Sequence, residues 1–497
     1  MNGPGTNIPD EIMRPGKRKS HTPKDKELAN KKLKIDNYQN EQNENVRRSN
    51  RLKDNPKILY DENDSIYEHI LYFAMFRAET VANDVPKCFQ EIELRKDRDE
   101  WMKAVHDKLN SLQTNKTWTL VEDPRLKNPE LKEPVKCEWI FSIKSDENGN
   151  PTRYKARLVA CGYSQEYLVN YNETFAPVAR ISSFRFIIAF ANQFDLLIHH
   201  MDVKTAFLNG ILEHEVYMDV PIGVKSDKNQ VCKLHKSLYG LKRAARCWYA
   251  IFHKVLIELG FKNSPVDKCV YILFKGNICL NIYVILYVND LVIVTKKIDV
   301  MNKFKSYLAS KFKMTDLKNI KLFLGIRIIR ENDKISLDQT SYINKILRKF
   351  NMNVSKRNKT PLVEKVNFEE LQSDERYNAP CQNLLGCLMY LMVCTRPDLS
   401  FTVDILSRFV NKNNEITWKY LRGVLRYLKG TLNLKLVYKR NNNQDSEFLT
   451  AYVDSDWTED EITRRNTTGY LFKLFENCSI TWGTKRQHSV ADSSTAA

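Results

Sequence analysis

The chain has 497 residues, of which 42% are hydrophobic, and this supplies enough apolar material for roughly two to four domains with buried cores. Its formal net charge of +18 favours a polyanionic partner such as a nucleic acid, although a merely soluble basic protein fits the charge equally well. Eleven cysteines without a C-x-x-C spacing argue against a disulfide framework and a zinc site, and favour a reducing intracellular compartment.

The N-terminal 60 residues differ in composition from the rest of the chain. They are rich in Lys, Arg, Asn, Asp and Glu and nearly free of aromatic residues, so we expect residues 1–60 to be disordered. Basic clusters at 17–19, 31–34 and 47–48 are typical of nuclear import signals or nucleic-acid-binding tails. A solvated linker explains them as well. The polar N-terminus is not a secretory signal, and no later segment is a convincing membrane span.

Folded structure is predicted to begin near Asp97. Apolar residues at helical spacing predict an amphipathic helix, namely Trp101, Val105, Leu109 and Leu112. Alternating apolar residues then predict a strand, namely Cys137, Trp139, Phe141 and Ile143. Asn148-Gly149 predicts a turn, and the chain returns as a strand from Arg153 to Cys161.

The returning strand carries a basic stripe. Arg153, Lys155 and Arg157 share one face because side chains alternate along a strand. Such a stripe could close over a triphosphate, but the pattern alone favours a solvated strand face.

Two carboxylates stand at the ends of apolar, strand-like runs. Runs 282–286 and 291–295 flank Tyr287-Val288-Asn289-Asp290 and predict a β-hairpin with a two-residue turn at Asn289-Asp290. Asp202 closes a similar run, 196–201. A cap or a turn explains either Asp alone, but two acids from two sheet positions suit Mg²⁺, which prefers oxygen ligands and takes one or two carboxylates plus phosphate oxygens.

The C-terminal third is helix-patterned before it ends in strand-like runs. Segments 342–350, 387–408 and 418–430 predict helices, and Cys381, Cys387 and Cys394 are expected in or beside an apolar core.

Several short sequence motifs together indicate a family resemblance. They are YKARLVA at 154–160, ETFAPVAR at 173–180, MDVKTAFLNG at 201–210, LYGLK at 238–242, YVND at 287–290, FLGIR at 323–327, TRPDL at 395–399, YVDSDW at 452–457 and TTGYLF at 467–472. Because these motifs occur in this order, the chain resembles the reverse transcriptase of copia-type long-terminal-repeat retrotransposons from about Arg47 to its end.

The resemblance implies a multidomain fold of α+β and α/β type. A right-hand polymerase with fingers and palm at 97–310 and a thumb-like segment at 311–372 would be followed by a connection at 373–447. A truncated ribonuclease H-like α/β domain would occupy 448–497. Residues 1–60 would correspond to the linker between integrase and reverse transcriptase.

The resemblance also implies roles for individual residues. Asp202 and Asp290 would hold Mg²⁺, with Mn²⁺ as an alternative, for two-metal nucleotidyl transfer onto a primer 3′-hydroxyl. Nucleotide-binding positions would be Lys155, Arg157, Thr205, Ala206, Phe207 and Arg243, with Phe207 excluding a 2′-hydroxyl. Asp454 would be a ribonuclease H metal ligand, and Asp456 a weaker candidate.

Four positions depart from the family pattern. Asn289 stands where the family usually has the first Asp of the hairpin, Cys161 where it has Arg or Lys, Arg243 where it has Gln, and Ala496 where it has Glu. One charge pair at ~4 Å and an effective dielectric of ~20 is worth roughly 4 kcal/mol, which is about a thousandfold in rate. We therefore expect an impaired polymerase without ribonuclease H activity, and poor order beyond roughly Leu449.

The implied partners are an RNA template, a DNA primer or RNA–DNA hybrid, and deoxynucleoside triphosphates, but no membrane. Other products of the retrotransposon polyprotein are further candidates, and the implied location is a cytoplasmic particle, the nucleus or both. A non-enzymatic nucleic-acid-binding relic or a domesticated protein is the alternative hypothesis. An unrelated basic nuclear scaffold does not explain the ordered motifs.

Overall fold

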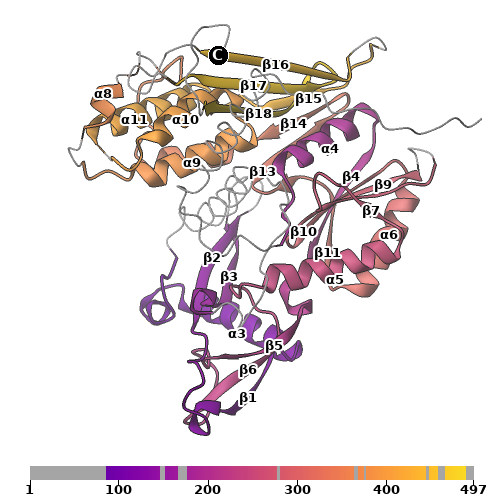
Figure 1. Ribbon diagram of the computed structural model, residues 1–497, viewed down its shortest axis with the longest axis vertical. Helices are drawn as coiled ribbons and strands as arrows, with labels where there is room; N and C mark the ends of the chain where they lie inside the picture. The colour runs from indigo at the N-terminus through magenta and orange to yellow at the C-terminus, as the bar shows by residue number, and fades with distance from the viewer. Residues whose placement is uncertain are drawn as a thin grey trace, which may run out of the picture. The chain divides into compact units, whose positions relative to one another are not determined.

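The computed structural model describes residues 85–145, 151–165, 176–276, 280–362, 366, 368–373, 377–412, 414–443, 447–456 and 465–487 (Figure 1). All of them fall within one compact unit of the chain, Asn63–Ala497. The expected tail at 1–60, the Asn148-Gly149 turn, residues 173–175 and Ala496 lie outside the described residues. No described helix is long and apolar enough to cross a membrane.

A six-stranded antiparallel sheet holds the two carboxylates. Its order is β11-β4-β10-β9-β8-β7, with bounds Met314–Asn319, Leu197–Val203, Asp290–Thr295, Ile282–Tyr287, Val270–Leu273 and Lys262–Asn263. The apolar runs of β9 and β10 are buried almost throughout, as expected for strands covered on both faces. The two predicted runs therefore form the centre of a core.

Three helices cover this sheet. Helix α6, Ile298–Lys311, contacts the face of β4 that carries His199, because Lys305 Nζ lies 2.5 Å from His199 Nδ1. Helix α5, Ala244–Glu258, packs its Phe252 against Phe312 at the end of α6. Helix α4, Ile181–Gln193, lies between the sheet and the C-terminal strands (Figure 1).

Residues before and after α4 together build a second core. Helix α3, Arg98–Thr114, packs on the hairpin of β2, Cys137–Ser145, and β3, Pro151–Ala160. The Trp101 ring meets Phe141 and Tyr154 edge-on, at centroid distances of 5.4 and 4.6 Å. The helix and both strands confirm the sequence-based prediction. A three-stranded sheet adjoins them, in the order β1-β6-β5 with bounds Trp118–Glu122, Gln230–Lys236 and Ile211–Met218.

Residues after β11 form a further sheet and a group of helices. The sheet has the order β12-β13-β14-β15, with bounds Leu322–Phe323, Ile326–Glu331, Lys334–Asp338 and Leu436–Lys439. The helices are α7 Thr340–Lys349, α8 Phe368–Leu371, α9 Cys381–Cys394, α10 Ser400–Arg408 and α11 Glu415–Gly430. The predicted helix 387–408 is thus two helices, because the 3-10 turn Pro397–Leu399 interrupts it.

Short 3-10 turns complete the described structure, at Gln90–Leu94, Pro124–Leu126, Gly162–Ser164 and Ala206–Asn209. Cys381 and Cys394 are buried in cores and Cys387 packs at the edge of one, as expected. All cysteines among the described residues are free.

The TRPDL motif at 395–399 has a structural role that the sequence did not reveal. Arg396 is 2% exposed and donates from Nε and Nη2 to the Asp398 carboxylate, at 2.9 and 2.6 Å. Tyr427 of α11 donates its hydroxyl to the same carboxylate at 2.7 Å, and Arg396 also bonds Thr431. This partly buried network joins the start of α10 to the end of α11.

The C-terminal residues form a three-stranded antiparallel sheet, β16-β17-β18, with bounds Leu449–Asp456, Thr467–Leu474 and Cys478–Arg486. The expectation of poor order beyond Leu449 is therefore wrong for the described residues. Buried Arg185 of α4 donates to Ile480 O at 2.6 Å, to Cys394 O at 3.1 Å and to Val393 O, and lies 3.9 Å from the Trp482 ring centroid. These contacts tie β18 to α4 and to the end of α9.

Candidate active site

Asp202 and Asp290 lie directly opposite each other in the six-stranded sheet. They are register partners of the antiparallel strands β4 and β10, each at the strand end nearest the hairpin tip. Register partners in an antiparallel pair have Cα atoms roughly 4.5–5.5 Å apart, so the two carboxylates start from neighbouring backbone positions. The sequence predicted that each carboxylate stands at the end of a strand, and the structure shows that the two strand ends lie side by side.

The hairpin differs from the prediction by one residue. Tyr287 pairs with Asp290, so the two-residue turn is Val288-Asn289 and Asp290 is the first residue of its strand. Val288 has φ +54°, a strained conformation for a β-branched residue that is typical of functional sites. Trp248 Nε1 donates to Val288 O at 2.6 Å, and Val203 N donates to Asn289 O at 2.8 Å. These two bonds fix the turn against α5 and against the residue after Asp202.

The side chain of Asn289 leaves a polar atom without a partner. Its Oδ1 is buried and accepts no hydrogen bond, which is costly for an amide oxygen unless another group occupies the site. Asp202, Asp290 and Asn289 would offer only oxygen donors, as a hard divalent cation requires. The residues therefore fit Mg²⁺. No group of three or more His, Cys, Asp and Glu that could hold a metal occurs in the described part of the chain.

His200 is a residue that the sequence reasoning missed. Its Nε2 lies 2.7 Å from Asp290 Oδ1, with 9% of the His200 side chain and 35% of the Asp290 side chain exposed. The available signal was its place two residues before Asp202, which puts both side chains on one face of the strand.

Phe207 and the preceding residues lie just beyond β4. Thr205 has φ +55° and begins the 3-10 turn that contains Ala206 and Phe207. The Phe207 ring is partly buried against both cores and lies 5.6 Å from the Tyr239 ring. Ser237 donates to Phe207 O at 2.5 Å. The ring thus has a fixed position where the two cores meet.

The basic stripe of the β2–β3 hairpin is confirmed as one face of β3. Ala156, Leu158 and Ala160 are buried, so Lys155 and Arg157 lie on the opposite face. Arg157 Nη1 donates to Ser142 Oγ at 2.8 Å. Burial, and then the charge of Arg157, lowers the pKa of Lys108 on α3 to about 8. Lys155 and Arg157 belong to another sheet than Asp202 and Asp290.

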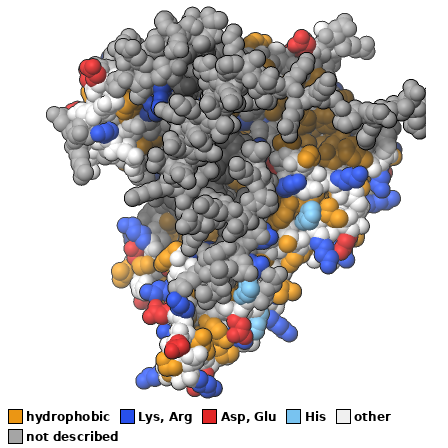
Figure 2. Space-filling view, in the orientation of Figure 1, with side chains coloured by type: hydrophobic (Ala, Val, Ile, Leu, Met, Phe, Trp, Pro, Cys, Tyr) orange, Lys and Arg blue, Asp and Glu red, His pale blue; other side chains and the backbone are white. Residues whose placement is uncertain are grey.

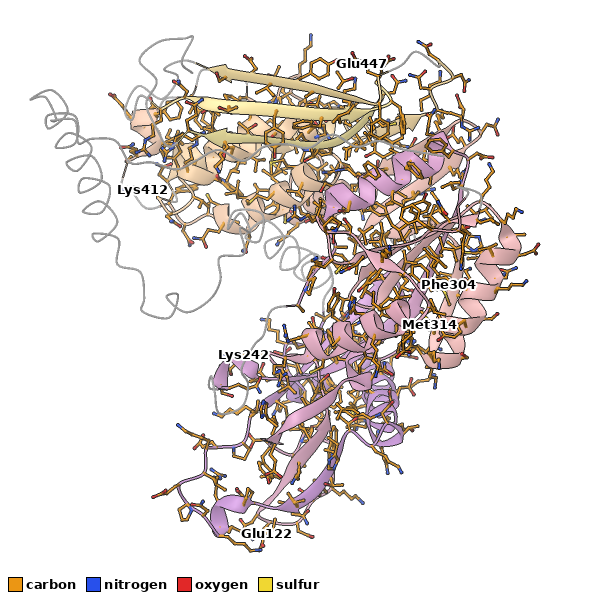
Figure 3. All side chains as sticks on the ribbon, turned by 45° about the vertical axis from the view of Figure 1, so that its right-hand side comes forward. Glu122, Lys242, Phe304, Met314, Lys412 and Glu447 are labelled. Atoms are coloured by element: carbon orange, nitrogen blue, oxygen red, sulfur yellow. The ribbon has the colours of Figure 1, made fainter. Side chains whose placement is uncertain are left out.

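Two glycines allow the backbone at the end of β3 to contact the LYGLK motif at 238–242. A Cβ on Gly240, where φ is +94°, would lie 2.1 Å from Ala160 O, and one on Gly162 would lie 2.1 Å from Gly240 O. Gln165 accepts from Lys242 N at 2.9 Å, and Lys242, labelled in Figure 3, donates its Nζ to Gln165 O. This contact brings β3 next to Arg243, which precedes α5.

Arg243 lines a small pocket together with Gln165, Leu212, His214, Val216, Leu241 and Cys247. Cys161, the other departure near this contact, is buried, and burial raises its thiol pKa. The side chain at this position therefore points into protein and is not a ready anion ligand.

Asp454 lies on β16, far along the chain from the carboxylate pair. It is exposed, and its Oδ1 accepts from Ser455 N at 2.9 Å. The side chain of Asp456 is outside the described residues.

Two contacting segments of the C-terminal helical region are rich in cations. Helix α7, the following loop and α11 join through Lys429 Nζ, which donates to Ser355 O at 2.6 Å, and Asn358 N, which donates to Arg426 O at 3.2 Å. Residues 340–362 and 415–430 hold ten Lys and Arg but one acid, Glu415. We call the ten the basic surface: Lys345, Arg348, Lys349, Lys356, Arg357, Lys359, Lys419, Arg422, Arg426 and Lys429. Figure 2 shows Lys and Arg scattered among acids and apolar residues on the visible part of the lower domain.

Comparison with known proteins agrees with this arrangement. Residues 115–364 match the family described as reverse transcriptase (RNA-dependent DNA polymerase). The match covers half of the chain and includes both carboxylates and the hairpin. The chain therefore belongs to the reverse transcriptase family.

Its relatives include Pol polyproteins of copia-type transposons. It is 38% identical over 424 residues to the Retrovirus-related Pol polyprotein from transposon TNT 1-94 of Nicotiana tabacum, covering 83% of this chain and 31% of the relative. It is 36% identical over 403 residues to that from transposon RE1 of Arabidopsis thaliana, covering 80% and 27%. It is also 31% identical over 294 residues to the putative transposon Ty5-1 protein of Saccharomyces cerevisiae, covering 58% and 94%. The chain thus spans less than a third of either Pol polyprotein.

Proposed function

We propose that this chain is an RNA-directed DNA polymerase of a copia-type retrotransposon, impaired at one metal-binding position. It would extend a DNA primer on an RNA template with deoxynucleoside triphosphates. The observation that carries the proposal is the register pairing of Asp202 with Asp290 beside a strained hairpin turn. The position of this pair inside the reverse transcriptase match supports it further.

In this proposal Asp202 and Asp290 each contribute a carboxylate oxygen to Mg²⁺, and Asn289 contributes its buried Oδ1. Bound Mg²⁺ would lower the pKa of the primer 3′-hydroxyl and neutralise charge on the triphosphate. The residues themselves mainly position the reactants, as in other phosphoryl transfers. The hydrogen bonds to Val288 O and Asn289 O keep the turn in place for this task.

We assign nucleotide recognition to the region where the two cores meet. The amides of Thr205 and Ala206 and the Phe207 ring would face the sugar and triphosphate, with Phe207 excluding a 2′-hydroxyl. Lys155 and Arg157 on β3 would approach the phosphates from the β2–β3 hairpin. Arg243 would lie at the same nucleotide, since the glycine contact joins β3 to the start of α5.

In polymerase terms, the β2–β3 hairpin would belong to the fingers and the six-stranded sheet to the palm. The basic surface would follow the phosphates of the RNA–DNA hybrid, as clustered cations do in nucleic-acid-binding proteins. The aromatic rings of Phe350 and Trp418, with centroids 6.1 Å apart, lie within the same segments. Asp454 is exposed and accepts a hydrogen bond from Ser455 N, and ribonuclease H activity is not part of the proposal.

A nucleic-acid-binding protein without polymerase activity is the second candidate. Asn289 favours it, because a neutral amide lacks the charge that an acid would place beside the metals. The loss of a charge pair worth roughly 4 kcal/mol would lower the rate about a thousandfold.

Primer extension on an RNA template with deoxynucleotides and Mg²⁺ tests the two candidates. The natural chain is compared with Asn289→Asp, and Asp202→Ala supplies the blank. We expect weak extension or none from the natural chain and recovery in Asn289→Asp. Extension by the natural chain equal to that of Asn289→Asp would refute the impairment.

Silence from both chains would refute the polymerase assignment and leave the binding candidate. That candidate requires primer–template affinity that falls steeply with salt. Each phosphate contact contributes about 0.9 to the slope of log affinity against log salt on duplex DNA. Replacing Lys356, Lys359, Lys419 and Lys429 with Gln should therefore reduce the slope, whereas the same change at four exposed lysines outside the basic surface should not.

A further inference from the structure

The Asp290 carboxylate has one oxygen already engaged by a neighbouring strand. His200 Nε2 lies 2.7 Å from Asp290 Oδ1. His200 pairs with Val292, so its ring reaches diagonally across β4 and β10 to the residue opposite Asp202. His200, Asp202 and Asp290 therefore project from the same face of the sheet.

The direction of this hydrogen bond follows from the chemistry of the groups. An ionised carboxylate only accepts hydrogen bonds, so the proton must lie on His200 Nε2. The imidazole is then a donor to Asp290 Oδ1, and it is not itself available as a metal ligand through that nitrogen.

The imidazole is also held from behind. Its ring meets the Phe323 ring edge-on, with centroids 5.9 Å apart and an interplanar angle of 84°. Phe323 is buried and stacks on Phe184 of α4 at 4.5 Å. Phe323 of the FLGIR motif thus supports the carboxylate pair through His200. The donor nitrogen of His200 therefore has a fixed position.

We propose that His200 is a positioning residue for the metal site: it holds Asp290 Oδ1 and leaves Oδ2 as the oxygen that binds the cation. This inference rests on the proposed function, because it concerns the same metal site. Hydrogen-bonded partners of metal ligands orient those ligands, and their loss typically lowers metal affinity about 10- to 100-fold. Orientation matters more here than in a site with three carboxylates, because only Asp202 and Asp290 supply charge.

The neighbouring histidine provides a matched control. His199 is also buried in β4 but lies on the opposite face, where it contacts Lys305 Nζ at 2.5 Å. Lys305 also forms an ion pair with Asp316, at 2.7 Å, which does not involve the His199 side chain. His199→Leu therefore perturbs the same strand to a similar degree without touching Asp290.

The test is a titration of the full chain with Mn²⁺, followed by the electron paramagnetic resonance signal of the free ion. Natural chain, His200→Leu, His200→Gln and His199→Leu are compared, each also with Asn289→Asp, and Asp202→Ala defines background binding. Near-UV circular dichroism verifies the fold of each variant. Gln retains an N–H donor of similar reach, whereas Leu has none.

We expect His200→Leu to weaken Asp202-dependent Mn²⁺ binding about 10- to 100-fold. His200→Gln and His199→Leu should stay within about threefold of their parent chain. Asp202-dependent binding that is unchanged in His200→Leu would overturn the positioning role but leave the proposed metal site intact. Equal losses in His200→Leu and His200→Gln would also overturn it, because a donor would then not be what matters. Absence of Asp202-dependent binding from every chain, including Asn289→Asp, would overturn the metal site and this inference together.

Discussion

Arg185 is the residue whose replacement should most disturb the junction between α4 and the C-terminal strands. Its guanidinium is buried and bonds the carbonyls of Ile480, Val393 and Cys394, two of which belong to the last turn of α9. Carbonyls at a helix C-terminus carry partial negative charge, so a cation is favourable there. Arg185→Leu removes this cation and leaves three carbonyls without their donor.

The magnitude follows from two opposing effects. Hydrogen bonds to charged groups contribute about 1.5–3 kcal/mol each, so the three carbonyls together gain about 5–9 kcal/mol. Burial of a charge offsets several kcal/mol of this gain, and burial correspondingly lowers the pKa of Arg185. We therefore expect Arg185→Leu to destabilise the junction by about 2–4 kcal/mol.

Hydrogen–deuterium exchange measured by mass spectrometry locates this effect. A local loss of 2–4 kcal/mol corresponds to exchange about 30- to 900-fold faster in β18 and at the end of α9. Arg185→Lys should fall between the natural chain and Arg185→Leu, because an ammonium keeps the charge but cannot stack on Trp482 as a plane. Arg422→Leu, an exposed change on α11, is the control and should alter stability by less than about 0.5 kcal/mol. Exchange in β18 that changes less than threefold in Arg185→Leu would refute the reasoning.

Further predictions concern Gly240, Gly386 and Lys108. Gly240→Ala should prevent accumulation of folded protein, since its Cβ would lie 2.1 Å from Ala160 O at a φ of +94°. A Cβ on Gly386 in helix α9 would meet nothing within 4 Å, so Gly386→Ala should stabilise by about 1 kcal/mol. The yield of soluble protein measures the loss in Gly240→Ala, and urea unfolding measures the gain in Gly386→Ala. Lys108 should be acylated with a pH midpoint near 8, because burial and then the charge of Arg157 favour its neutral form. Arg157→Gln should move this midpoint upward in competitive labelling with Lys103 as reference, and an unmoved midpoint would exclude Arg157 as a cause.

Local patterns predicted the centre of the molecule well. The runs around Asp202 and Tyr287 are β4, β9 and β10, because alternation and β-branched residues act over a few residues. The predicted turn, Asn289-Asp290, lies one residue after the observed turn. Asn and Asp are favoured in turns, whereas a β-branched residue such as Val288 is not. Val288 has a positive φ as the first residue of the two-residue turn, and Trp248, 40 residues earlier, bonds its carbonyl. A contact of this range leaves no local signal.

The C-terminal sheet shows the same limit on a larger scale. Its strand β18 is bonded to α4 through Arg185, which lies 295 residues before its partner Ile480. In the sequence, Arg185 is one cation in an apolar helix. No neighbouring residue indicates that it bonds three backbone carbonyls. His200 was closer to prediction, because its spacing from Asp202 fixes its face, but its partner Asp290 is 90 residues away.

The residues that hold this fold are largely separate from those that would carry out chemistry. Trp248 and Val203 bond backbone carbonyls of the hairpin turn, and these bonds do not depend on the side chain at 289. A charge can therefore be lost at this position without loss of the fold. The converse change, Asn289→Asp, should retain the fold but add a third carboxylate beside Asp202 and Asp290.

Without a cation, Asn289→Asp should be less stable than the natural chain, by about 1–3 kcal/mol, because a buried acid is brought next to two others. Mg²⁺ binds only the folded site, so it should restore this loss by mass action and raise the melting temperature more in Asn289→Asp than in the natural chain. Thermal unfolding in EDTA and in a Mg²⁺ series measures both effects, and Asp202→Ala in each background removes the specific contribution. Equal Mg²⁺-dependent shifts in the two chains would mean that the side chain at 289 does not face the cation, and the impairment would then need another cause.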